Sequence, residues 1–264
     1  MSTAALLEAP QAPRRSRPTL RSMGAIFLAG GIAGFAVGGI GSRVAMRIAA
    51  LAAGDPARER ITEAGATIGR ITAEGTLFLV VFGGIGATLI GTACYVVTRP
   101  WLPRRRVVRA VTFGVLELVI LGSALVDASN RDFAILGHPL LNVTLFASLF
   151  VLHGFALVML VDPSGRFVSR LSRARWRARL VDLGTLVAIG LTAVGAVAMG
   201  ARGGGSARFE WITLAICAVG ITLIDPRRAR PITVPALRLV GAVALAIIAI
   251  SGAWALLDNV TTIV

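Results

Sequence analysis

Glu117 and His153 are the two residues whose types and positions could do chemistry together. Glu117 stands at the middle of an apolar run, residues 107–126, so it would lie near the centre of a membrane-spanning helix. A charged carboxyl there costs about 2.5–3.5 kcal/mol, so the neutral, protonated form is favoured. His153 lies about 4 Å from the centre of the next apolar run, counted by helical rise. The two side chains therefore share a depth and could form a hydrogen bond.

The Glu117–His153 pair allows two interpretations. In the functional one, it accepts a proton or coordinates a cation beside an interior cavity, because ionisable groups inside membranes usually mark solute or proton paths. In the structural one, a neutral Glu117 bonds to His153 or to nearby backbone and simply holds two helices together. The sequence leaves both interpretations open.

A second set of charged residues follows the first apolar run. Arg43 and Arg47 are spaced i, i+4, so they project from one side of a helix at its outer end. Their long apolar side chains could let the guanidinium groups extend to the lipid headgroups. Alternatively, the two groups could bind an anion together, because paired guanidinium groups suit phosphate or carboxylate. Arg70 is a further candidate for headgroup or anion binding, and Glu63 and Glu74 are candidates for the rim of an outer vestibule.

The sequence shows no pattern for a cofactor or a metal. The two cysteines, Cys94 and Cys217, lie inside apolar runs and not in a Cys/His cluster. There is no lysine for a retinal Schiff base, no HExxH, no P-loop and no serine elbow. His138 and His153 lie about 22 Å apart along one segment, too far for a shared haem. We therefore expect no cofactor and no metal, and we lean against an enzyme.

Composition indicates that the elements around these residues lie in a membrane. Of the 264 residues 56% are hydrophobic, and the mean hydropathy is +0.80, which is too apolar for an ordinary soluble domain. The net charge of +14 comes from 27 arginines with no lysine. These arginines flank apolar runs, where they can interact with anionic lipid headgroups. Because no nucleic-acid-binding module is recognisable either, we do not expect nucleic acid as a partner. The arginine-rich, lysine-free composition is typical of a GC-rich bacterial genome.

The apolar runs predict an all-α polytopic membrane protein, a bundle of seven transmembrane helices in a single domain over residues 23–264. A span needs about 20 apolar residues. The seven predicted spans are residues 24–44, 76–97, 107–126, 140–161, 183–200, 209–224 and 236–257. Residues 1–22, rich in proline and arginine, are predicted to be a disordered basic tail. If the first run is a cleaved signal peptide, six spans remain, but its length favours an uncleaved span.

The distribution of arginines predicts the orientation. Counted from the N-terminus, the first, third, fifth and seventh hydrophilic segments hold 19 arginines, and the alternate segments hold 8. Arginine-rich segments stay in the cytoplasm. We therefore predict a multi-pass protein of the bacterial cytoplasmic (inner) membrane, with its N-terminus inside and its C-terminus outside.

Two hydrophilic segments are predicted to form amphipathic surface helices, one after the first span and one after the fourth. Asp55-Pro56 and Asp162-Pro163 both match a helix start, with an N-cap followed by an N1 proline. An apolar stripe spaced by three and four follows each start. The first helix would lie on the outer face, and the second on the anionic inner leaflet.

Small residues at every fourth position predict where the helices pack most closely. Such a stripe lets a neighbouring backbone approach, and it could also serve a homodimer. The first span carries one stripe and the second span carries another: Gly30, Gly34 and Gly38, then Gly83, Ala87 and Gly91.

Three functions follow from these patterns. The first is a small transporter or channel-like permease, with Glu117 and His153 as a coupling or gating pair. The second is a structural or assembly subunit of a larger membrane complex. The third is an intramembrane enzyme acting on lipid, which would need Arg43 and Arg47 to converge with acidic residues. The expected partners are the bilayer, with anionic lipids in its inner leaflet, and a homo-oligomer or a larger complex.

Overall fold

In the part of the chain that it describes, the computed structural model consists of helices joined by turns and loops, with no strand there and one isolated bridge residue, Ile61. It describes residues 20–55, 59–61, 68, 72–78, 80, 84–124, 126, 128–202 and 233–264. The predicted all-α class is therefore confirmed over these residues. The predicted tail lies outside them except for its last three residues, which belong to the first helix.

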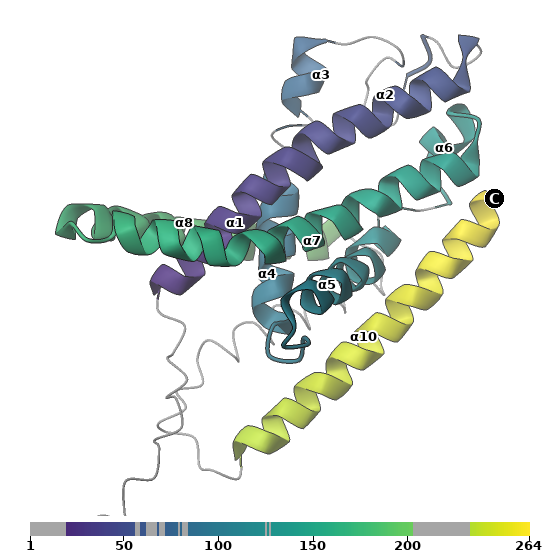
Figure 1. The fold of residues 1–264 in the computed structure, drawn as a ribbon. Helices are drawn as coiled ribbons and strands as arrows, with labels where there is room; N and C mark the ends of the chain where they lie inside the picture. Colours follow the sequence, from purple (N-terminus) through teal and green to yellow (C-terminus); the bar gives the residue numbers. More distant parts are fainter. Residues whose placement is uncertain are drawn as a thin grey trace, which may run out of the picture.

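The chain forms several long apolar helices, which short helices and loops connect (Figure 1). Their bounds are α1 (Leu20–Ala33), the π-helix η2 (Gly34–Gly41), α2 (Ser42–Ala53), α3 (Ala73–Phe78), α4 (Gly86–Thr98), α5 (Arg106–Leu121), the 3-10 helix η5 (Gly122–Ala124), α6 (Arg131–Ile135), α7 (Pro139–Leu171), α8 (Arg175–Arg202) and α10 (Thr233–Ile263).

Three of the described helices are long and apolar enough to cross a membrane. They are Leu20–Ala53, Pro139–Leu171 and Leu239–Ile263, with mean hydropathies of 1.9, 2.2 and 2.3. They contain most of the first, fourth and seventh predicted spans, so the chain has the helices of a membrane protein. The sixth predicted span lies outside the described residues, and the complete seven-span bundle stays a prediction.

Several helices continue beyond the predicted membrane spans. The first helix extends past residue 44 to Ala53, and α7 extends past residue 161 to Leu171. The α8 helix begins at Arg175 rather than at residue 183. Hydropathy locates the part of a helix that suits hydrocarbon, whereas backbone hydrogen bonding continues through polar residues that can lie in the headgroup region.

Neighbouring helices run in opposite directions. A Cβ atom on Gly41, in η2, would lie 3.2 Å from the Leu149 side chain of α7, while Ala49 of α2 packs with Leu136, which precedes α7. The order of these contacts makes α2 and α7 antiparallel. At the same end of the bundle, Val260 near the end of α10 packs against a cluster formed beside α6, and Figure 1 shows the C-terminus there.

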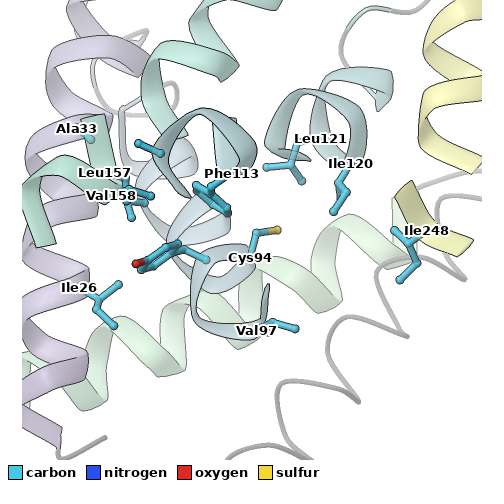
Figure 2. Packing of buried hydrophobic residues seen from close by; sticks show 12 residues of the cluster. Ile26, Ala33, Cys94, Val97, Phe113, Ile120, Leu121, Leu157, Val158 and Ile248 are labelled. Atoms are coloured by element: carbon cyan, nitrogen blue, oxygen red, sulfur yellow. The ribbon is translucent and has the colours of Figure 1, made fainter. Parts of the chain in front are cut away.

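The central core lies where α1, α4, α5 and α7 meet. Tyr95 of α4 and Phe113 of α5 make an edge-to-face contact, with ring centroids 5.0 Å apart. Leu157 of α7 is fully buried in the same cluster, and Cys94 is buried as a free thiol. Figure 2 shows these side chains converging from several helices. This core fixes the helices that carry Glu117 and His153.

The predicted surface helix after the first span does not form over the residues that the structure describes there. Glu59 has a φ of +66°, and the backbones of Glu59 and Arg60 exchange hydrogen bonds with Ile68. These hydrogen bonds join residues eight and nine apart, which a continuous helix from Asp55 would exclude. Ile68 is buried against Ala49 and Leu136, so tertiary contacts replace the amphipathic face that the spacing predicted.

The predicted surface helix after the fourth span is also wrong as a separate element. Asp162-Pro163 lies inside α7, and the helix changes direction only after Leu171. Val168 packs inside the molecule, while Phe167 is 55% exposed and can face lipid. The Arg106 side chain supplies a donor to the Met159 carbonyl, which the ring of Pro163 leaves without its helical partner.

Candidate functional site

The candidate site is the buried pair of Glu117 on α5 and His153 on α7. Glu117 Oε1 and His153 Nδ1 lie 2.7 Å apart, and the two side chains are only 2% and 3% exposed. Both residues lie on faces that also carry core side chains. The structure thus brings together the two residues that hydropathy and depth selected, and it joins two antiparallel helices through them.

Two glycines provide the space that the pair occupies, and a third lets α5 and α7 approach closely. A Cβ atom on Gly91 of α4 would clash with Glu117 Oε1 and with the His153 ring, and one on Gly154 of α7 would lie 2.7 Å from Glu117 Oε2. A Cβ atom on Gly114 of α5 would lie 2.5 Å from the Val151 carbonyl oxygen. The backbones of three helices therefore approach the carboxyl and imidazole groups directly, as small residues in membrane bundles permit.

Each member of the pair keeps one polar atom without a hydrogen-bond partner in the described part of the chain. These atoms are Glu117 Oε2 and His153 Nε2, and Thr92 Oγ1 on α4 is a third buried atom of this kind. Buried polar atoms are normally paired, because an unmade hydrogen bond costs about 1–3 kcal/mol. The pair can therefore bind a further proton or another polar group without first losing its internal bond.

The pair has a defined proton capacity. One proton can lie between Oε1 and Nδ1, which gives either a neutral acid with a neutral imidazole or a carboxylate with an imidazolium. Nε2 of the imidazole carries a hydrogen in both forms. A second proton can therefore bind at Oε2 of the carboxylate form, and it leaves the pair with one positive charge. Because the surroundings are apolar, each change of charge alters the electrostatic energy strongly.

The arginine and glutamate candidates predicted for the outer end do not contact one another as Glu117 and His153 do, within the described residues. Arg43 is half-buried and its Nη2 atom is buried without a hydrogen-bond partner, whereas Arg47 is exposed. Glu74 is exposed in the first turn of α3. Glu63 and Arg70 lie outside the described residues. No ion pair links Arg43, Arg47 and Glu74 in the part of the chain that the structure describes.

The glycine stripe of the first span lies in the contact between α1 and α4. Cβ atoms on Gly30 and Gly34 would clash with the hydroxyl groups of Thr92 and Thr88, and Thr88 Oγ1 donates a 3.2 Å hydrogen bond to the Gly30 carbonyl. The stripe therefore packs inside the bundle. It is not an open face for a homodimer.

The third member of the predicted stripe is shifted by one residue. Gly39 is buried against Val80, while Gly38 is only half-buried. The reason is the π-helix η2, whose wider turn places residues five apart on one face, so Gly34 is followed by Gly39.

Of the stripe predicted for the second span, only Gly91 can be placed by its contacts, and Gly84, which was not part of that stripe, also makes a close contact. Gly84 approaches Gly34, whereas Gly91 faces the Glu117–His153 pair. Gly83 lies outside the described residues, and the side chain of Ala87 is not described.

Sequence reasoning missed the glycines on α5 and α7. Gly114 precedes Glu117 by three residues and Gly154 follows His153 directly. Small residues beside a membrane-buried ionisable group were therefore a usable signal. Helical spacing placed Gly114 on the Glu117 face, but only the crossing of α5 and α7 shows that the two glycines meet.

Comparison with known proteins identifies no relative: no protein-family model, no curated protein and no solved structure matches the chain. Within the described residues, no group of three or more His, Cys, Asp or Glu side chains could hold a metal ion. The chemistry of the Glu117–His153 pair is therefore the basis for a functional proposal.

Proposed function

We propose that this protein is a small membrane transporter or channel-like permease in which Glu117 and His153 bind the coupling or gating proton. The observation that supports this proposal is the buried carboxyl–imidazole bond, with one unpartnered polar atom on each side. Ionisable groups are expensive inside a membrane and usually mark proton or ion pathways. A pair with a purely structural role would gain nothing from keeping two further polar atoms unpaired.

Proton binding at this pair would be coupled to helix packing. The pair joins α5 to α7, and Gly91 brings α4 against both side chains. A second proton adds a positive charge between three closely packed backbones, which disfavours the closed arrangement. The energetic cost of that charge is the means by which protonation shifts the helices toward a second conformation.

The proposal is tested by proton flux in liposomes. The purified full chain is reconstituted, a pH gradient is applied, and the internal pH is followed with a trapped dye. We expect wild-type vesicles to dissipate the gradient faster than empty ones, and Glu117→Gln to lose most of this difference, because an amide cannot exchange a proton. His153→Gln should reduce the rate as well.

The matched control is Asp258→Asn, which makes the same chemical change on the exposed face near the end of α10. Its flux should equal that of wild type. Equal flux from wild-type and Glu117→Gln vesicles, with both proteins correctly folded, would contradict a proton role for the pair and favour the structural interpretation.

The second candidate function is an assembly subunit, and one observation favours it. The apolar helix Leu239–Ile263 has only 11% of its most apolar window buried inside the molecule. Lipid or a partner helix could cover this surface. Crosslinking in native membranes from a residue on its exposed face, such as Trp254, distinguishes the two functions. A discrete larger complex supports an assembly role.

The lipid-acting enzyme stays a prediction, because Glu63 lies outside the described residues.

A further inference from the structure

Pro163 creates a gap in the hydrogen bonding of α7. In an α-helix, the N–H of residue 163 would donate to the carbonyl of Met159, but proline has no N–H and its ring crowds that carbonyl. The helix nevertheless continues without interruption from Pro139 to Leu171. Met159 therefore requires a donor from outside its own helix.

Arg106, the first residue of α5, supplies this donor. Its Nη2 donates to the Met159 carbonyl oxygen, and its Nε lies 3.6 Å from Asp162 Oδ2. One guanidinium group thus contacts both the carbonyl freed by proline and the carboxylate next to that proline. The fork geometry of arginine suits two acceptors on one side, which the point charge of a lysine would not match.

The Arg106 contact is the outermost of three connections between α5 and α7. The inner two are the close backbone approach of Gly114 to Gly154 and the Glu117–His153 bond. The inner connections are buried, whereas the side chains of Arg106 and Asp162 are 45% and 61% exposed. Water, salt and headgroups can therefore compete for the outer connection alone.

We propose that Arg106 is a latch on a hinge at Pro163. While the latch is closed, the carbonyl of Met159 is satisfied and the final part of α7 continues along its axis. When another acceptor takes the guanidinium, that carbonyl loses its donor and α7 bends at Pro163, a usual position for a helix kink. This conformational device goes beyond the proposed permease function and does not depend on it.

The latch is tested with pairs of spin labels in the full chain in nanodiscs, with Cys94 and Cys217 replaced by alanine. One pair joins Val243 on α10 to Ser169, which follows the hinge, and the control pair joins Val243 to Leu152, which precedes it. All three positions are exposed. Arg106→Ala should shift the Val243–Ser169 distance by roughly 3 Å, the displacement that a 20° kink gives about 9 Å beyond the hinge. The Val243–Leu152 distance should not change.

Two further variants separate the latch from a general loss of packing. Pro163→Ala restores an N–H to the Met159 carbonyl, so Arg106→Ala should produce no shift in that background. Asp162→Asn removes the ion pair but leaves the Met159 bond, so its shift should be smaller than that of Arg106→Ala. The proposal is overturned if Arg106→Ala leaves the distance unchanged, if Pro163→Ala fails to suppress the shift, or if Asp162→Asn moves the helix equally far.

Discussion

At the scale of single residues, the site depends on the absence of side chains as much as on their presence. Gly91, Gly114 and Gly154 allow three backbones to surround Glu117 and His153. Any larger residue would separate the carboxyl from the imidazole or push one helix away from another. Excess volume in a packed core costs about 1–3 kcal/mol, which is comparable to the strength of the hydrogen bond that it would break.

We therefore predict that Gly91→Ala destabilises the protein by about 1–3 kcal/mol, because its methyl group overlaps Glu117 and His153. Gly86→Ala on the same helix is the control. No heavy atom lies within 4 Å of its added Cβ, so the higher helix propensity of alanine should stabilise it by up to about 1 kcal/mol. Thermal unfolding in detergent measures both. Equal midpoints for the two variants would show that the space at Gly91 is not needed.

At the scale of elements, α1 and α4 are fixed to each other through small residues and threonines. Thr88 Oγ1 reaches the backbone of α1, and Gly34 lies directly against the backbone of Gly84. The π-helix η2 then turns the stripe so that Gly39 packs against Val80, which precedes α4. In a regular α-helix, Gly38 rather than Gly39 would follow Gly34 on this face.

At this contact we expect Gly34→Ala to destabilise the protein by about 1–3 kcal/mol. Its Cβ would lie 2.5 Å from the Gly84 carbonyl oxygen and 3.0 Å from the Thr88 amide nitrogen. Gly31→Ala, on the neighbouring face, would meet only a Thr88 methyl group at 4.0 Å and should be close to neutral. The comparison is made by chemical denaturation in detergent, and a neutral Gly34→Ala would contradict a tight α1–α4 contact.

At the scale of the whole molecule, the described helices give the bundle two chemically different ends. Arg106 and Asp162 mark one end, where α5 begins and the apolar part of α7 stops. The other end carries Asn259 of α10, which accepts a hydrogen bond from the Ala128 amide and so fastens the C-terminal helix to the loop after η5. The first end is also the arginine-rich one, so we predict from the positive-inside rule that it faces the cytoplasm.

This orientation predicts how the two ends react with a membrane-impermeant thiol reagent. In the background without native cysteines, His138→Cys should be labelled in intact cells, because residue 138 is exposed at the end predicted to lie outside. Arg104→Cys, exposed at the opposite end, should be labelled only after lysis. The reverse pattern would contradict the predicted topology. As a control for accessibility, both variants should react in lysed cells.

The sequence by itself predicted apolar membrane-spanning helices, the helical class and a shared depth for Glu117 and His153, because hydropathy and helical rise are local properties that need no tertiary contact. It could not determine where helices end, since α7 continues through Pro163 and the donor to the Met159 carbonyl comes from Arg106 on another helix. It also could not place Gly39 against Val80, because the π-helix η2 changes which residues share a face. The pair itself shows this division: chain spacing gave its two members one depth, and the crossing of α5 and α7 at glycine brought them within hydrogen-bond distance.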